Sequence, residues 1–138
     1  MAGLQVLEES FAGQGFHLLG FYSDNFGMQG GSQDQIDACT DNYMVTFEQF
    51  VKANVIDPDG AGVEAPQPVW QWLLGQPNPE AYPLQPDWNF HKYVISKDGQ
   101  LVRHFDTQTY PGDDPNDPND SFETSPIVMA IEAELAKP

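Results

Sequence analysis

Three side chains in this sequence have the chemistry needed to stabilise an anion. Trp88 and Asn89 are adjacent at the entry to an alternating segment, residues 90–96, and Asn25 lies in a loop after an apolar run. An indole N–H only donates, and an amide group has two donor hydrogens. Such donors suit a thiolate, a selenolate or the oxygen that leaves a peroxide. The alternative is structural, with Trp88 a buried aromatic residue at a strand entry and Asn89 a turn residue.

Hydrophobic spacing and turn residues predict the elements that must position these side chains. Leu4, Leu7 and Phe11 have helical spacing, and Ser32 with Gln35 forms a capping-box pattern. An Asp98-Gly99 turn separates two alternating segments and indicates a hairpin. The sequence predicts helices over residues 4–11, 32–43, 66–74 and 126–135, and strands over residues 16–21, 45–47, 90–96 and 101–105.

Five segments, taken in order, resemble one known family. They are Gly-Leu-Gln-Val-Leu at 3–7, the strand and Asn-Phe-Gly loop at 15–29, Tyr-Met-Val-Thr-Phe-Glu-Gln-Phe at 43–50, Pro-Val-Trp-Gln-Trp-Leu at 68–73 and Trp-Asn-Phe at 88–90. This order resembles the glutathione peroxidase family of thioredoxin-fold thiol and seleno-peroxidases. The resemblance implies an α/β, thioredoxin-like fold, with a central mixed sheet flanked by helices. It also implies a single domain over residues 1–138.

The resemblance assigns roles to four residues. Asn25, Trp88 and Asn89 match the side chains that surround the family's peroxide-reducing cysteine or selenocysteine. Asn25 departs from the family's Gln and is one methylene shorter. Cys39, the single cysteine, matches the resolving cysteine of thioredoxin-dependent members. The alternative interpretation is that Cys39 is a small buried hydrophobic residue on the same helix face as Ile36.

The family's first strand and its Cys-Gly-x-Thr or selenocysteine-Gly-x-Thr turn precede the segment that matches residues 3–7. We therefore expect the domain to be incomplete at its N-terminus, with the first strand and the peroxidatic residue upstream of this chain. A selenocysteine codon read as a stop, with a restart at Met1, is one hypothesis. A truncated fragment is the plainer explanation. Either way, we expect the chain alone to be inactive.

The charge balance narrows the set of partners. The chain carries 21 acidic residues against five basic ones, a net charge of −16. Binding to nucleic acid or an anionic membrane needs clustered Lys and Arg, so neither partner is expected. The same excess disfavours a basic pocket for anionic glutathione. No bilayer-length apolar run or signal peptide is visible, and a cytoplasmic location is favoured. We expect no cofactor, no metal site, and a monomer or weak homo-oligomer.

The resemblance implies an enzyme of the oxidative-stress response that reduces hydroperoxides, with glutathione or thioredoxin as reductant. The alternative from another class is a non-catalytic thioredoxin-fold binding module. The upstream sequence discriminates between them, because the enzyme requires a cysteine or selenocysteine followed by Gly-x-Thr.

Overall fold

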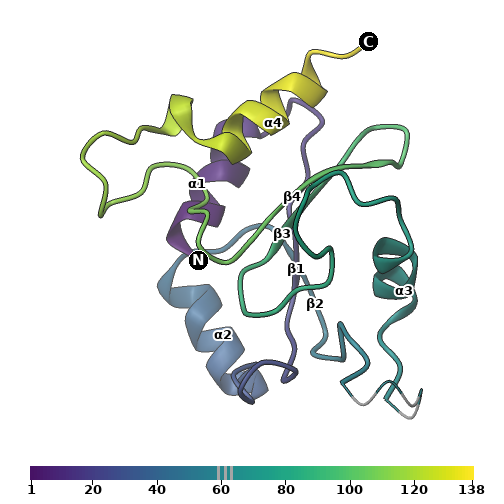
Figure 1. The fold of residues 1–138 in the computed structure, drawn as a ribbon. Helices are drawn as coiled ribbons and strands as arrows, with labels where there is room; N and C mark the ends of the chain where they lie inside the picture. Colours follow the sequence, from purple (N-terminus) through teal and green to yellow (C-terminus); the bar gives the residue numbers. More distant parts are fainter. Residues whose placement is uncertain (59, 61, 63) are drawn as a thin grey trace.

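A computed structural model describes residues 1–138 except 59, 61 and 63 (Figure 1). The elements, in chain order, are α1 (Ala2–Phe11), β1 (Leu19–Phe21), α2 (Gln33–Asn42), β2 (Glu48–Phe50), α3 (Pro68–Leu74), β3 (Lys92–Ile95), β4 (Leu101–Phe105), a 3-10 turn (Phe122–Thr124) and α4 (Pro126–Leu135). The four predicted helices are present. The strand predicted over 16–21 is shorter, and the one predicted over 45–47 begins three residues later. In the described part of the chain, no helix has the length and apolarity needed to cross a bilayer.

The expected central mixed sheet is instead two separate two-stranded sheets, which corrects that prediction. β1 and β2 run parallel, with Leu19 opposite Glu48 and Phe21 opposite Phe50. β3 and β4 form the antiparallel hairpin, with an irregularity at Val94 and Ile95. Among the described strands, no ladder joins the two pairs. Each strand therefore keeps one edge without a backbone partner.

Trp70 of α3 connects the two sheets through its side chain. Its ring lies edge-on to Phe21 of β1 at 5.7 Å and to Tyr93 of β3 at 5.5 Å between centroids. These two edge-on contacts link side chains of the two sheets, between which no ladder is formed by the described strands.

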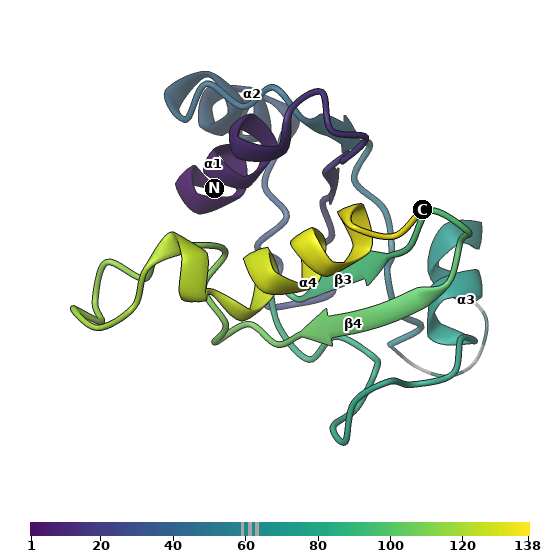
Figure 2. The ribbon, with the colours of Figure 1, turned by 90° about the horizontal axis from the view of Figure 1, so that it is seen from above.

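Two hydrophobic clusters stabilise the arrangement. One joins α1, β4 and α4 and includes Leu7, Phe105 and Val128. The other lies beside α3 and includes Phe26, Leu73 and Leu101. Figure 2 shows α4 along the hairpin, α1 and α2 on the other side of α4, and α3 at the far edge. Burial of this apolar surface is the main favourable term in folding.

Sequence signals at the helix ends have different outcomes. The predicted capping box of α2 is confirmed, since Ser32 accepts from the Gln35 backbone N–H and Gln35 Oε1 accepts from the Ser32 N–H at 2.8 Å. Ser125 occupies the N-cap position of α4, followed by Pro126. Its buried hydroxyl makes no side-chain cap and has no partner among the described residues. The side-chain cap expected of a serine at this position is therefore absent from α4.

The proline-rich segment 76–86 is tied to the hairpin by polar contacts. The Tyr82 hydroxyl donates to the His104 carbonyl, and the Tyr93 hydroxyl donates to the Leu84 carbonyl at 2.7 Å. Arg103 forms an ion pair with Glu80. Together these contacts hold residues 76–86 against the β3–β4 hairpin and fix the position of the chain that leads to Trp88.

Candidate active site

Trp88 and Asn89 lie at the surface beside the loop that follows β1. Trp88 is 47% exposed, and its ring lies 6.5 Å from that of the buried Phe26. Asn89 is half-buried. The indole N–H makes no hydrogen bond within the part of the chain that the structure describes. The wholly buried alternative for Trp88 therefore does not apply.

The loop after β1 is shaped by an acidic residue and two left-handed backbone positions. Asp24 accepts from the Gly30 N–H at 3.0 Å and pairs with Lys52 at 2.6 Å, which closes residues 24–30 into a compact turn. Gly27 and Met28 both have positive φ. A Cβ on Gly27 would lie 3.5 Å from the Trp88 ring, so glycine lets the loop approach the indole closely.

The turn brings a third amide to the Trp-Asn pair. Asn89 Nδ2 donates to Gln29 Oε1 at 2.6 Å, although the two residues are 60 positions apart in sequence. The other Asn89 hydrogen, the Gln29 amide hydrogens and the Trp88 N–H are all donors. Gln29 was not predicted as a site residue. The signal that could have found it is an amide side chain in the glycine-rich stretch directly after Asn-Phe-Gly.

Among the described residues, the Asn25 side chain forms no hydrogen bond with Trp88 or Asn89. Asn25 Oδ1 accepts from the Ser23 hydroxyl at 2.7 Å and from the Val55 N–H at 2.8 Å. Its Nδ2 donates to Asn54 Oδ1 at 3.2 Å. These contacts tie the loop after β1 to the segment after β2. In this geometry Asn25 braces the loop that carries Phe26 and Gln29.

The far side of Asn89 is supported by the segment after β4. The Thr107 hydroxyl donates to the Asn89 carbonyl. Lys92 Nζ donates to the carbonyls of Asp106 at 2.9 Å and Thr109 at 2.5 Å. Burial lowers the pKa of Lys92 to about 8. Neither Thr107 nor Lys92 was predicted, because their roles depend on a contact between segments distant in sequence.

Helix α1 begins next to this support. Met1, Gly3 and Leu4 line a cavity of about 200 Å³ together with Phe90, Lys92 and Thr107. A Cβ on Gly3 would lie only 2.6 Å from the Pro111 carbonyl oxygen, so the helix can approach the segment after β4 only with glycine there. The start of α1 is therefore fixed beside the residue that follows Asn89.

Cys39 is half-buried on α2. Figures 1 and 2 show α2 beside α1 and the N-terminus. This position is compatible with either of its predicted roles.

A pair of histidines lies under the hairpin entry. His104 is fully buried, and its Nδ1 is 2.9 Å from His91 Nε2, while its Nε2 is 2.9 Å from Asn78 Oδ1. Asn78 Oδ1 also accepts from the Glu80 N–H, so His104 donates to it from Nε2. His104 Nδ1 then accepts from His91, whose own buried Nδ1 has no partner among the described residues.

Both histidines are held neutral by their surroundings. Burial, followed by the His104 ring, lowers the pKa of His91 to about 4. Burial also lowers the pKa of His104. Asp87 and Asp106 oppose the shift in His91, and Lys92 adds to it. Across the described residues, no three His, Cys, Asp or Glu side chains are grouped to hold a metal ion.

A solved structure shares this fold. The crystal structure of Trgpx in its apo form matches this structure with a TM-score of 0.65 and 23% sequence identity, over 99% of this chain and 70% of that one. That likeness establishes a thioredoxin-like α/β fold.

Sequence comparison then gives the family. The chain is 32% identical over 111 residues to the glutathione peroxidase-like peroxiredoxin gpx1 of Schizosaccharomyces pombe. It is 36% identical over 110 residues to the glutathione peroxidase homolog BsaA of Halalkalibacterium halodurans, and 32% identical over 114 residues to the hydroperoxy fatty acid reductase Gpx2 of Synechocystis. These matches cover 79%, 78% and 81% of this chain. The chain belongs to the glutathione peroxidase family.

The chain spans 66% of the length of each of these three relatives. No family model matches it.

Proposed function

We propose that the protein to which this chain belongs reduces hydroperoxides with a thiol reductant, using a cysteine or selenocysteine that precedes residue 1. The observation that carries the proposal is the 2.6 Å hydrogen bond between Asn89 and Gln29, because it joins the Trp-Asn pair to the loop after β1. The start of α1 lines a cavity with Phe90, directly after that pair. A chain segment that enters α1 would therefore come close to Phe90, the residue that directly follows the Trp-Asn pair.

The chemistry follows from those donors. The thiolate or selenolate attacks one oxygen of the hydroperoxide, the O–O bond breaks, and the other oxygen leaves as an alcohol after taking a proton. The nucleophile is left as a sulfenic or selenenic acid, oxidised by two electrons. The Trp88, Asn89 and Gln29 donors stabilise both the attacking anion and the leaving oxygen.

Asn25 and Cys39 enter the proposal in different ways. Asn25 acts on the site by bracing its loop, because its own amide already has partners in the chain. Cys39 is the candidate resolving thiol, because it is the single cysteine of the chain and lies half-buried on α2. In such a step the Cys39 thiol condenses with the oxidised nucleophile, releases water and forms a disulfide or selenenylsulfide.

We also propose that residues 1–138 and the upstream segment form one domain. The nucleotide sequence upstream of residue 1 tests this directly. The expected result is a cysteine codon, or an in-frame stop codon that specifies selenocysteine, followed by codons for Gly-x-Thr. An upstream sequence with neither overturns the proposal and favours a non-catalytic binding module.

The activity test compares two tryptophans of similar exposure in the protein with its upstream segment, carrying cysteine at the nucleophile position. Trp88→Phe should lower the rate of peroxide reduction by about 10²-fold, the typical effect of losing one anion-stabilising donor. The matched control is Trp72→Phe, because Trp72 is 42% exposed but lies on α3. Equal effects of the two changes would mean that the Trp-Asn motif is only structural.

A further inference from the structure

Met28 lies at the tip of a four-residue turn in the loop after β1. The Gln29 N–H donates to the Phe26 carbonyl at 3.3 Å, and the two residues between them, Gly27 and Met28, both have positive φ. Two central residues with positive φ are typical of a type I′ turn. Met28 is 78% exposed, so solvent and small molecules reach its thioether.

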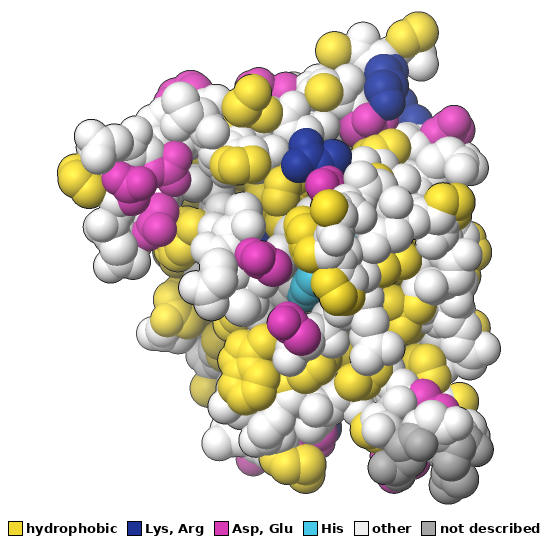
Figure 3. Space-filling view, viewed as in Figure 1, with side chains coloured by type: hydrophobic (Ala, Val, Ile, Leu, Met, Phe, Trp, Pro, Cys, Tyr) yellow, Lys and Arg dark blue, Asp and Glu magenta, His cyan; other side chains and the backbone are white. Residues whose placement is uncertain are grey.

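The other three residues of this turn lie against the Trp-Asn pair. The Phe26 ring is 6.5 Å from the Trp88 ring, and a Cβ on Gly27 would lie 3.5 Å from the same ring. Gln29 accepts from the Asn89 amide at 2.6 Å. The methionine at the tip is thereby placed beside the indole and amide donors. Figure 3 shows exposed hydrophobic side chains at the lower end of the molecule, where Figure 1 places the loop after β1.

Met44 matches Met28 in everything except its neighbours. Both are 78% exposed, and both have a positive φ, of 49° at Met44 and 56° at Met28. Met28 precedes α2 and Met44 follows it, and a helix of ten residues is about 15 Å long. A difference in reactivity between the two thioethers therefore reports the surroundings of Met28 and not its exposure or backbone conformation.

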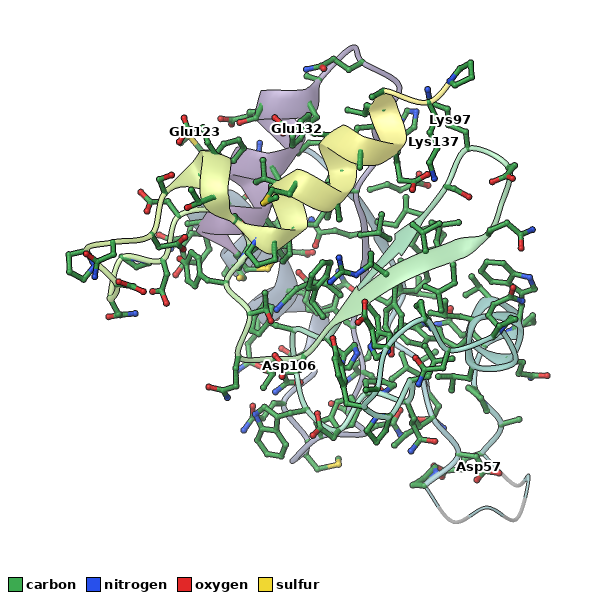
Figure 4. The ribbon with its side chains drawn as sticks, turned by 45° about the horizontal axis from the view of Figure 1, so that its top comes forward. Asp57, Lys97, Asp106, Glu123, Glu132 and Lys137 are labelled. Atoms are coloured by element: carbon green, nitrogen blue, oxygen red, sulfur yellow. The ribbon has the colours of Figure 1, made fainter. Side chains whose placement is uncertain are left out.

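Met129 is a further exposed thioether and also lies apart from the site. It is 57% exposed on α4. Figure 4 shows Glu132 of the same helix well separated from Asp106, the residue before Thr107 at the site.

We propose, building on the donors of the proposed function, that Met28 is a second oxidation site for hydroperoxides, where the donors around the Trp-Asn pair hold the peroxide beside the thioether. The indole N–H and the free hydrogens of the Asn89 and Gln29 amides are donors only. They suit the oxygen of a peroxide and the negative charge that develops on it as it leaves. Methionine needs no deprotonation to react, so neither the upstream nucleophile nor a reductant takes part.

The step is a two-electron oxygen transfer. The Met28 sulfur attacks the terminal oxygen of the hydroperoxide, an S–O bond forms and the O–O bond breaks. The other oxygen leaves with the electron pair of that bond and takes up the peroxide proton to become an alcohol. The thioether is oxidised to a sulfoxide and the hydroperoxide is reduced. One hydroperoxide is consumed for each Met28, so the step is not turnover.

Oxidation of Met28 changes the surroundings of the Trp-Asn pair. It converts an apolar side chain into a polar one, and the sulfoxide can be reduced again by methionine sulfoxide reductases. The sulfoxide oxygen accepts hydrogen bonds from the same donors that a hydroperoxide uses. The oxidised turn therefore competes with the substrate, and excess peroxide lowers the activity of the site reversibly.

The first test uses the 138-residue chain and tert-butyl hydroperoxide, with sulfoxide formation at each methionine followed by peptide mass spectrometry. Met28 should be oxidised about tenfold faster than Met44, less than the effect of a buried donor because Trp88 is half-exposed. Trp88→Phe should lower the Met28 rate toward that of Met44, and the matched control Trp72→Phe should not. Chloramine-T, an oxidant without an O–O bond, should oxidise Met28 and Met44 at similar rates.

Two outcomes of this test overturn the assignment of Met28. One is equal oxidation of Met28 and Met44 by the hydroperoxide, and the other is an equally large preference for Met28 with chloramine-T. Because the chain tested carries no residue proposed as the nucleophile, either outcome leaves the proposed function standing. An upstream sequence without a nucleophile overturns the proposed function and leaves the preference for Met28 unaffected.

The second test measures the effect of the sulfoxide in the protein with its upstream segment. The protein is treated with excess tert-butyl hydroperoxide, and a dithiol then reduces its cysteines but not its sulfoxides. The rate of peroxide reduction should be several-fold lower after this treatment and should recover with a methionine sulfoxide reductase. In Met28→Leu the treatment should cost much less activity, and Met44→Leu, the matched control, should behave as the wild type. An equal loss in both variants would show that the Met28 sulfoxide does not act on the site.

Discussion

Asn89 donates a 2.6 Å hydrogen bond to Gln29, and this bond joins the hairpin entry to the loop after β1. The Thr107 hydroxyl donates a second hydrogen bond to the backbone carbonyl of Asn89. One hydrogen bond therefore holds the Asn89 side-chain amide, and another holds its backbone. A donor that is already oriented stabilises developing charge without having to reorganise.

Replacing Gln29 should separate activity from stability. Gln29→Ala removes the acceptor that orients Asn89, so kcat/KM for hydroperoxide should fall by about tenfold in the protein with its upstream segment. The bond is exposed, so the free energy of unfolding should change by less than about 1 kcal/mol. Gln33→Ala is the matched control, because Gln33 also makes an exposed amide bond, to Asp37. Loss of activity in both variants would contradict the orienting role of Gln29.

The 138-residue chain alone should show no peroxidase turnover. The proposed nucleophile lies upstream of residue 1, and the single cysteine of the chain lies on α2, where we propose a resolving thiol. Hydroperoxide consumption measured with both glutathione and thioredoxin systems checks this. Turnover that disappears in Cys39→Ser would show that Cys39 is itself the nucleophile.

Asn25→Ala should be costly for folding. The change leaves the N–H groups of Val55 and Ile56 without their acceptor, and an unsatisfied polar group inside a protein costs about 1–3 kcal/mol. We expect the free energy of unfolding to fall by about 2 kcal/mol, measured by chemical denaturation. Asn119→Ala, on an exposed loop, is the control and should change it by less than about 0.5 kcal/mol. An unchanged free energy of unfolding in Asn25→Ala would show that Asn25 does not brace the loop after β1.

The sequence predicted what depends on local pattern. The capping box at Ser32, the four helices and the hairpin around Asp98-Gly99 follow from signals a few residues apart, and all are present. The proximity of Trp88 to the loop after β1 was expected from family resemblance, since 60 residues separate Asn89 from Gln29.

The sequence did not predict features that depend on the meeting of distant segments. The Asn89 amide contacts Gln29 and not Asn25, because the positive φ angles of Gly27 and Met28 turn the loop after Phe26. The expected sheet is divided into two pairs of strands, and the Trp70 ring contacts both pairs through Phe21 and Tyr93. The direction of the His91–His104 hydrogen bond depends on Asn78, which lies outside the helices and strands. Each outcome is a tertiary contact that overrides a local pattern.

The short parallel pair should be the less stable of the two sheets. β1 has three residues, a backbone partner on one side only, and Leu19 is 48% exposed. β4 has five residues, of which Leu101, His104 and Phe105 are buried. Backbone amides of residues 19–21 should therefore exchange with solvent faster than those of residues 101–105, because exchange protection follows local burial. Slow exchange throughout 19–21 in a proven monomer would show that the β1 edge is closed.

Stability should fall with acidification because of the histidine pair. The pKa of His91 is about 4 in the folded chain and about 6.5 in an unfolded one. Between these values the unfolded state binds more protons, so stability rises with pH. The contribution is fully present above about pH 6.5 and is lost as the pH falls toward about 4. His104, whose pKa is also lowered, acts in the same direction.

The measurement is the free energy of unfolding of the 138-residue chain from about pH 7 to pH 4, in the wild type and in His91→Gln. The glutamine keeps a donor for His104 Nδ1 but does not titrate, so the loss of stability on acidification should be smaller in the variant. His17→Gln is the matched control, because His17 is exposed, and this variant should follow the wild type. Comparison with the variant also separates the histidine from the many carboxylates, which begin to take up protons at the lower end of this range. Identical pH profiles for the wild type and His91→Gln would mean that the buried pair does not couple folding to protonation.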